Sequence, residues 1–243
     1  MSIRNKKIRL AGAGNVWLVA DGIIRSDSLD HLTKDDVALL TGQYHLKTII
    51  DLRTDTEINE RPDKAIPGVE YIHIPLMEET TAGITKEHGT DPAAIAANLP
   101  DMPSLYRLLV TEQHSVEALS MILSIALDKN RQPVLYHCTA GKDRTGIVTM
   151  LILAYLGCTE EYIIEEYLQS NLTAIPASES MGRYVEQKTG SKAIADKVRH
   201  VFVADESYLR SAIEALNERW GNIDEFFNRL LPGARLERLP KAV

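Results

Sequence analysis

Short apolar runs of strand length recur through the first half of the chain. Asp21 and Gly22, a pair typical of the turn in a β-hairpin, lie between two of these runs. The other runs are bounded by polar residues, glycine or proline, and they are short enough to be buried strands. The predicted strands are residues 16–20, 23–25, 45–52, 69–76 and 133–137.

Segments with helical spacing of apolar residues lie between and after these strands. Thr33 is a typical helix N-cap, and Asp35 and Asp36 suit the positive end of a helix that runs to about Gly42. The other helices predicted in this part are residues 106–111, 115–129 and 144–156. From residue 160 to 231 the sequence predicts several short helices, with breaks near Pro176, Gly190, Asp205 and Gly221.

This alternation predicts an α/β fold, with a mostly parallel central sheet flanked by helices and a helical C-terminal part. No internal repeat and no long linker divides the chain. We therefore predict a single domain over residues 1–243, in which the place of residues 1–15 is open and residues 232–243 form a C-terminal tail. Residues 78–103 are acidic and rich in turn-forming residues, and they are long for a plain connector, which favours a mobile or functional loop.

Composition narrows the classes of function. The chain carries 27 basic and 34 acidic residues and a net charge of −7, which argues against a nucleic-acid partner. It has no apolar run of about 18 residues, so no integral membrane segment is predicted. Its two cysteines, Cys138 and Cys158, are too few for a disulfide framework, and we expect a cytoplasmic protein. The sequence leaves secretion without a signal peptide open.

The N-terminal region loosely imitates a signal peptide, because basic residues precede the apolar stretch Leu10–Ala20. Asn15 and two glycines interrupt that stretch. We therefore interpret it as a turn followed by a strand.

Candidate chemistry is concentrated in residues 138–144, here called the 138–144 loop, which lies between a predicted strand and a predicted helix. Its backbone N–H groups can converge on an anion, and the helix adds the positive end of its dipole. Arg144 can clamp two phosphate oxygens. Cys138 lies in this positive potential, which favours its thiolate and makes it a candidate nucleophile. The candidate phosphate-binding residues are Thr139, Ala140, Gly141, Lys142, Asp143 and Arg144.

The loop resembles the Cys-x5-Arg-[Ser/Thr] signature of the cysteine-dependent protein tyrosine phosphatase superfamily. The run from His137 to Gly146 is similar to one bacterial branch, the tyrosine–serine phosphatases with dual-specificity and phosphoinositide activity. Individually weak matches extend the resemblance to roughly residues 20–232, although the usual N-terminal segment Asn-Phe-Arg-Asp-x-Gly-Gly is missing. The weak matches include Ser26, Leu29, Thr33, Asp36, Ile50–Arg53, Glu57, Pro62, Asp63, Asp205, Tyr208 and Trp220.

The resemblance implies a phosphomonoester hydrolase with a PTP-like fold and a cysteinyl-phosphate intermediate, without metal or other cofactor. Phosphotyrosine, phosphoserine and phosphoinositides are the implied substrates, and phosphoproteins or inositol phosphates the implied partners. Cys138 attacks phosphorus, while Arg144 and the loop amides hold the phosphate oxygens. The supporting residues are His137, which orients the loop, Thr145, and Asp51, which we expect to pair with Arg53 at the end of the sheet.

Two aspartates are candidates for the general acid. A carboxylate beside a bound dianion is repelled unless it points away or carries a proton, and a protonated Asp143 would donate to the leaving group. In the related branch this aspartate is a candidate general acid, whereas distant members of the superfamily use an aspartate on a mobile loop, a place that Asp101 fits here. We favour Asp143.

Lys142 and Cys158 each have two interpretations. The Lys142 ammonium group is either solvated or an extra cation for multiply phosphorylated head groups. Cys158 is either an ordinary thiol or, with weaker support, a resolving cysteine in peroxide chemistry.

Competing motifs fail on their spacing. Gly141 and Lys142 do not form a Walker loop, Gly12 and Gly14 lack the third glycine of a dinucleotide site, and the seven histidines show no metal-ligand spacing. Two alternatives stay open: a rhodanese-like sulfurtransferase or arsenate reductase, and a non-catalytic phosphate-binding module of the same fold.

Overall fold

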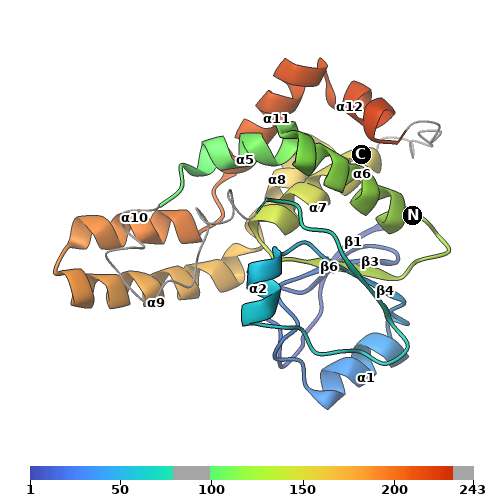
Figure 1. Ribbon diagram of the computed structural model, residues 1–243, viewed down its shortest axis with the longest axis horizontal. Coiled ribbons are helices and arrows are strands. Elements are labelled where there is room, and N and C mark those ends of the chain that lie inside the picture. The colour runs from blue at the N-terminus through green and yellow to red at the C-terminus, as the bar shows by residue number, and fades with distance from the viewer. Residues whose placement is uncertain (79–98, 232–243) are drawn as a thin grey trace.

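The computed structural model describes residues 1–78 and 99–231 of the 243-residue chain. Its centre is a six-stranded sheet in the order β1-β2-β3-β6-β4-β5 (Figure 1). Strands β3, β6, β4 and β5 are parallel to their neighbours in this order, and β1 and β2 add an antiparallel edge. The mostly parallel sheet is therefore confirmed. The strands are β1 (Ile3–Lys7), β2 (Trp17–Ala20), β3 (Ile23–Ser26), β4 (Thr48–Asp51), β5 (Glu70–His73) and β6 (Val134–His137).

Both faces of the sheet are buried, because successive strand residues enter different apolar clusters. In β4, Ile50 joins the larger cluster and Ile49 the smaller one, and β6 divides Tyr136 and Leu135 in the same way. This explains why the strands read as continuous apolar runs in the sequence. The smaller cluster includes Leu40 of α1 (Lys34–Gly42), the helix that covers that face.

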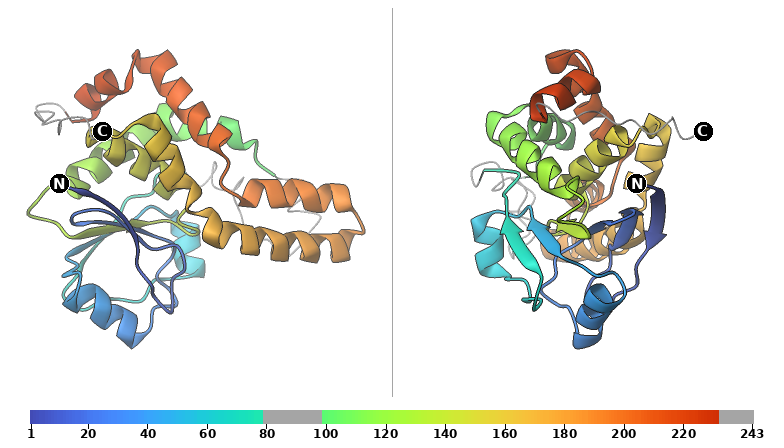
Figure 2. Two further views of the ribbon diagram at one scale, coloured as in Figure 1. Left: turned by 180° about the vertical axis from the view of Figure 1, so that it is seen from behind. Right: turned by 90° about the vertical axis from the view of Figure 1, so that its right-hand side faces the viewer.

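Most of the other helices cover the opposite face, as Figure 2 shows. Helix α2 lies near the ends of the parallel strands, and α9 and α10 form a hairpin that projects from the body (Figure 1). The helices after α1 are α2 (Asp55–Glu60), α5 (Met102–Thr111), α6 (Gln113–Ala126), α7 (Asp143–Tyr155), α8 (Glu160–Leu168), α9 (Asn171–Thr189), α10 (Lys192–Phe202), α11 (Glu206–Trp220) and α12 (Ile223–Leu230).

Local signals located most boundaries well. Thr33 caps α1 in a reciprocal capping box with Asp36, and β2 and β3 form the predicted antiparallel hairpin. The predicted break at Pro176 is wrong, since this proline lies inside α9. A proline there removes the hydrogen bond to the carbonyl of Leu172, an exposed residue whose carbonyl water can solvate.

The structure also bears on the predictions for the N-terminus, for residues 78–103 and for membrane segments. Residues 3–7, whose place was open, form the edge strand β1. The predicted loop at 78–103 falls largely on residues 79–98, outside the described residues, and α5 begins already at Met102. Among the described residues, no helix is long and apolar enough to cross a membrane.

Candidate active site

The 138–144 loop joins the end of β6 to the start of α7. Cys138 directly follows the strand and is only 2% exposed. Lys142 is the N-cap of α7, and its side chain makes no capping hydrogen bond, so the first amides of the helix are not satisfied by their cap. The positive end of the helix therefore faces the loop.

Carbonyl groups of the loop are held from outside by a ring of donors. Ser28 N donates to Thr139 O at 3.1 Å, and His137 Nδ1 lies 3.2 Å from Cys138 O. Asn15 Nδ2 donates to the carbonyls of residues 140 and 141 at 3.1 and 3.0 Å. Arg25 adds a second donor to the carbonyl of residue 141 at 3.3 Å.

These bonds determine where the loop amides point. In a trans peptide the N–H is directed opposite to the carbonyl of the preceding residue. Because the carbonyls of residues 138–141 face the supporting donors, the amides of residues 139–142 face the other side. None of these amides donates to a residue that the structure describes, so they form a concave set of donors suited to an anion.

Gly141 allows the loop to lie this close to β3. Its φ is +66°, in the left-handed region, and an added Cβ would lie 2.7 Å from Ser26 O and Asp27 N. Only glycine satisfies both conditions.

Glu57 fixes the guanidinium of Arg144. Its carboxylate accepts Nη1 at 2.5 Å and Nη2 at 2.7 Å, a bidentate geometry that sets the plane of the arginine fork. The same carboxylate accepts Thr139 Oγ1 at 2.5 Å and Thr54 N at 2.9 Å. Burial raises the pKa of Glu57, but the bonds to Arg144 and Thr139 outweigh burial and lower that pKa to about 2. Glu57 is therefore an anion at neutral pH.

Thr145 lies behind the sulfur of Cys138. Its hydroxyl is fully buried and is 3.2 Å from Cys138 Sγ, with the hydroxyl as donor. The hydroxyl is thus placed to stabilise negative charge on the sulfur.

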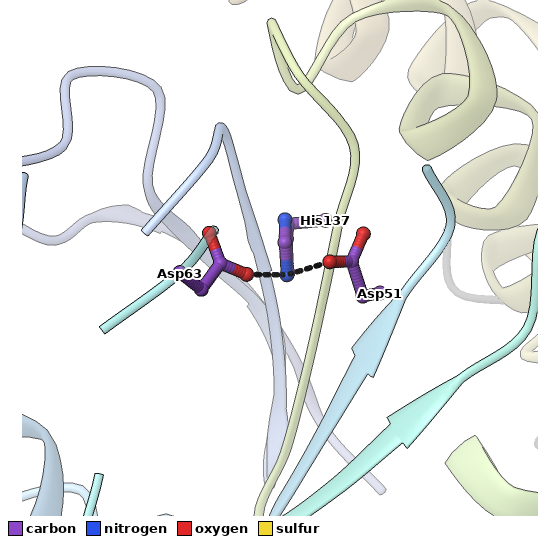
Figure 3. A group of neighbouring side chains, drawn as sticks. All are labelled: Asp51, Asp63 and His137. Carbon is purple, nitrogen blue, oxygen red and sulfur yellow. Dashed lines mark ion pairs between the residues drawn. The ribbon is translucent and has the colours of Figure 1, made fainter. Parts of the chain in front are cut away.

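A buried charge cluster surrounds His137, the residue that precedes Cys138 (Figure 3). His137 Nε2 lies 3.0 Å from Asp63 and 3.8 Å from Asp51, and Arg53 Nη2 bridges the same carboxylates at 2.9 and 2.7 Å. Burial lowers the pKa of His137, but the two carboxylates outweigh it and hold that pKa above its usual range. The expected pairing of Asp51 with Arg53 is thus observed, and the same cluster contacts the ring of His137, whose supporting role stays a prediction.

The same cluster brings together atoms that could be metal ligands, but an arginine already supplies the positive charge that a metal ion would bring. Single oxygens of Asp51 and Asp63 and a nitrogen of His137 lie within 4.8 Å of one another. The Arg53 guanidinium already occupies the space between the carboxylates as their counter-ion. We therefore interpret the group as an ion-pair network that supports the loop.

Lys142 matches neither interpretation of its side chain. It is 2% exposed, and its ammonium group donates to the carbonyls of Val201 and Val203 at 2.7 and 3.2 Å. These carbonyls lie at the end of α10, so the cation ties the 138–144 loop to the helical hairpin. The solvated alternative is wrong, and the ammonium group is engaged away from the loop amides.

The two candidate acids occupy different surroundings. Asp143 begins α7, its side chain is 18% exposed, and its Oδ1 accepts the hydroxyl of Tyr106 at 2.6 Å. Asp101 is an exposed N-cap of α5 and accepts Ser104 N at 3.2 Å. Asp143 belongs to the 138–144 loop itself, whereas the carboxylate of Asp101 is used to begin a helix.

Comparison with known proteins identifies the family. The profile of the tyrosine phosphatase family matches residues 12–241. The chain belongs to the tyrosine phosphatase family.

Similar proteins include phosphatases from two bacteria. The phosphatase is 25% identical over 252 residues to the triple specificity protein phosphatase PtpB of Mycobacterium tuberculosis, which covers 88% of this chain and 90% of PtpB. It is 31% identical over 151 residues to a tyrosine-protein phosphatase of Nostoc commune, covering 61% of this chain and 48% of that protein. Among solved structures, the catalytic core of the PP-IP phosphatase Siw14 from S. cerevisiae matches with a TM-score of 0.42 and 17% identity, covering 92% and 98% of the two chains.

The family assignment confirms that the chain is a phosphatase, as the loop motif predicted, and removes the sulfur-transfer and arsenate alternatives. Several residues around the loop of this phosphatase were not singled out from the sequence. Asn15 was noted only as a polar interruption, and Arg25 only as the end of a strand. Glu57 appeared only among the weak matches. An amide inside an apolar stretch and an arginine inside a buried strand are signals that could have marked them.

Cys158 is separated from Cys138 by the full length of α7. That helix has 13 residues and is about 20 Å long. Burial raises the pKa of the Cys158 thiol to about 11, which makes it a poor nucleophile. The resolving role is therefore incompatible with this arrangement.

Proposed function

We propose that this phosphatase hydrolyses phosphate monoesters through a covalent cysteinyl-phosphate, with Cys138 as the nucleophile. The observation that carries the proposal is the set of uncommitted amides at residues 139–142, held inward because every carbonyl from residue 138 to 141 is bonded outward. Together with Arg144 they supply donors to the non-bridging oxygens of a phosphate and stabilise the charge of the transition state.

The reaction has two steps. Cys138 Sγ forms a bond to phosphorus as the bond to the leaving oxygen breaks, and Asp143 gives that oxygen its proton. Water then attacks phosphorus, Asp143 takes a proton from the water, and the bond to sulfur breaks to release phosphate and the thiolate. The hydroxyl of Thr145 stabilises the departing sulfur, because it donates to Sγ.

Asp143 is the preferred acid because of its place in the molecule. It starts α7 beside the loop amides, and it is partly exposed, as an acid that exchanges protons with a substrate must be. Asp101 is the alternative acid, and its capping bond to Ser104 argues for a structural role.

The number of phosphate-binding groups near the loop ranks the candidate substrates. The phosphotyrosine and phosphoserine of phosphoproteins need one phosphate site, which the loop and Arg144 supply. A phosphoinositide with several phosphates needs further cations, and the Lys142 ammonium group is bound by the carbonyls of Val201 and Val203. We therefore propose phosphoproteins as the main partners and phosphoinositides as weaker substrates. A nucleophilic thiol also needs a reducing compartment, which favours the cytoplasm.

The test is a substrate panel combined with a trapped intermediate. We expect turnover of a nitrophenyl phosphate and of phosphotyrosine peptides, with lower activity on phosphoserine peptides and phosphoinositides. In rapid acid quench with 32P-labelled substrate, label should appear on the protein at Cys138. Cys138→Ser should bind vanadate but lose turnover and label, since a serine hydroxyl is not ionised here. Cys158→Ser is the matched control and should keep both. Turnover by Cys138→Ser near the wild-type rate would overturn the covalent mechanism.

A further inference from the structure

We propose that Tyr106 and Tyr167 are positioning residues for Asp143. Together they anchor one oxygen of its carboxyl group, so that the other oxygen faces the leaving group. This inference rests on the proposed function in one respect, the role of Asp143 as the acid.

The two tyrosines form a directed chain of hydrogen bonds. Tyr106 Oη donates to Asp143 Oδ1 at 2.6 Å, and the hydroxyls of Tyr106 and Tyr167 are 2.7 Å apart. A phenol has one proton, and that of Tyr106 is given to Asp143. Tyr167 must therefore be the donor in the bond between the hydroxyls. The chain runs from Tyr167 through Tyr106 to the carboxylate.

Both tyrosines are suited to act as permanent donors. Each is buried, and burial together with the nearby Asp143 carboxylate raises both pKa values well above the ordinary value of 10.0. They therefore stay neutral at physiological pH and keep their protons. Their rings pack edge to face with centroids 6.1 Å apart, so the hydroxyls have little freedom to turn away.

Gly146 provides independent support from the signature itself. An added Cβ at Gly146 would lie 3.0 Å from the Tyr167 ring. The glycine that follows Arg144 and Thr145 thus makes room for Tyr167, the first donor in this series of hydrogen bonds.

The carboxyl group of Asp143 is asymmetric as a result. Oδ1 accepts Tyr106 and lies 3.6 Å from Lys142 Nζ. The other oxygen accepts no hydrogen bond from any residue in the described part of the chain. Because Tyr106 comes from α5 and Tyr167 from α8, two helices outside the loop fix the orientation of Asp143. An acid held in this way loses less entropy on reaching the transition state.

The experiment compares Tyr106→Phe and Tyr167→Phe with Tyr136→Phe. Tyr136 is also fully buried and bonds Thr149 at 2.8 Å, so its variant loses a buried hydroxyl without touching Asp143. The readout is kcat/KM on a nitrophenyl phosphate, whose leaving group needs no proton, against phosphoserine, whose leaving group does. We expect Tyr106→Phe to lose about tenfold more activity on phosphoserine than on the aryl ester, and Tyr167→Phe a smaller amount in the same direction.

A second readout is the 13C signal of the Asp143 carboxyl carbon, assigned by its loss in Asp143→Asn. It should move in Tyr106→Phe and stay in Tyr136→Phe. Equal losses on the two substrates in Tyr106→Phe, or a loss pattern like that of Tyr136→Phe, would overturn the positioning role.

Asp143→Asn separates this failure from failure of the proposed acid. Suppose that Asp143→Asn lowers kcat/KM equally on both substrates, while Asp101→Asn lowers it more on phosphoserine than on the aryl ester. The assignment of Asp143 as the acid is then wrong, and the proposal that the tyrosines position a catalytic group is wrong with it. If Asp143→Asn discriminates between the substrates but Tyr106→Phe does not, the acid is correct and the tyrosines are only structural.

Discussion

Glu57 links α2 to Arg144 and Thr139 of the 138–144 loop, and Glu57→Gln tests what this link contributes to stability and activity. Glutamine keeps the size of the side chain but replaces one carboxylate oxygen by an NH2 group. That group cannot accept from Arg144, so the bidentate pair at 2.5 and 2.7 Å is lost. The bonds from Thr139 and Thr54 compete for the single oxygen that remains.

The magnitude follows from the pKa of Glu57. Its fall from the ordinary value of 4.5 to about 2 corresponds to about 3 kcal/mol of folding free energy for a side chain that is 24% exposed. Because the pKa is lowered in the folded state, this stabilisation is complete above about pH 4.5 and is lost as the pH falls through 2. At pH 3 about 1 kcal/mol should remain.

Urea unfolding at pH 7 and at pH 3 measures this dependence for the wild type and Glu57→Gln. The difference in unfolding free energy should fall from about 3 to about 1 kcal/mol. Glu60→Gln is the matched control, since Glu60 is an exposed carboxylate at the end of the same helix. It should give a difference within about 0.5 kcal/mol at both pH values.

Activity provides the second half of the test. Without the Glu57 carboxylate, the Arg144 guanidinium loses the bidentate pair that sets its plane, and its two-point grip on the phosphate weakens. We expect kcat/KM on a nitrophenyl phosphate to fall at least tenfold in Glu57→Gln and to stay within about twofold in Glu60→Gln. A stability difference that is the same at pH 7 and pH 3 would refute the ion pair as its source, and full activity would refute its role in seating Arg144.

The remaining predictions concern the support of the loop and the fate of its cysteine. Asn15→Ala should raise the inhibition constant of vanadate about tenfold, since the carbonyls of residues 140 and 141 lose a shared donor; an unchanged constant would mean that the loop needs no such support. Mild peroxide should inactivate the wild type and Cys158→Ser at the same rate, with protection by vanadate. Mass spectrometry should find no disulfide between Cys138 and Cys158, because α7 separates them; finding one would contradict the arrangement described.

Sequence reasoning is most direct where the relevant groups are close together in the chain. Cys138 and Gly141 lie between β6 and α7, and Arg144 lies in the first turn of α7, so their spacing alone predicts an anion site. The capping box of Thr33 and the hairpin at Asp21 and Gly22 are local in the same sense. Each depends on backbone geometry over a few residues, which the residue types largely determine.

The supports of the loop were not predictable in this way, because they are made between distant parts of the chain. Asn15 bonds a carbonyl that is 125 residues away, and Arg25 pairs with Glu166, which is 141 residues away. Lys142 is the clearest case. Its sequence neighbours suggested a solvated or phosphate-facing cation, and only the packing of the α9 and α10 hairpin brings the carbonyls of Val201 and Val203 to its ammonium group.

These long-range supports explain how an anion site can exist before the anion arrives. Amides without partners are costly in a folded protein, and a loop free to relax would turn its peptides to satisfy them. Here such a turn would break the carbonyl bonds from Asn15, Arg25 and Ser28 at the same time. The fold therefore holds the loop in a conformation that leaves its amides without partners, as the proposed phosphate site requires. Since the donors lie in β3 and in the segments flanking the β2–β3 hairpin, and Arg25 is itself held by Glu166 of α8, the loop conformation depends on elements from across the domain.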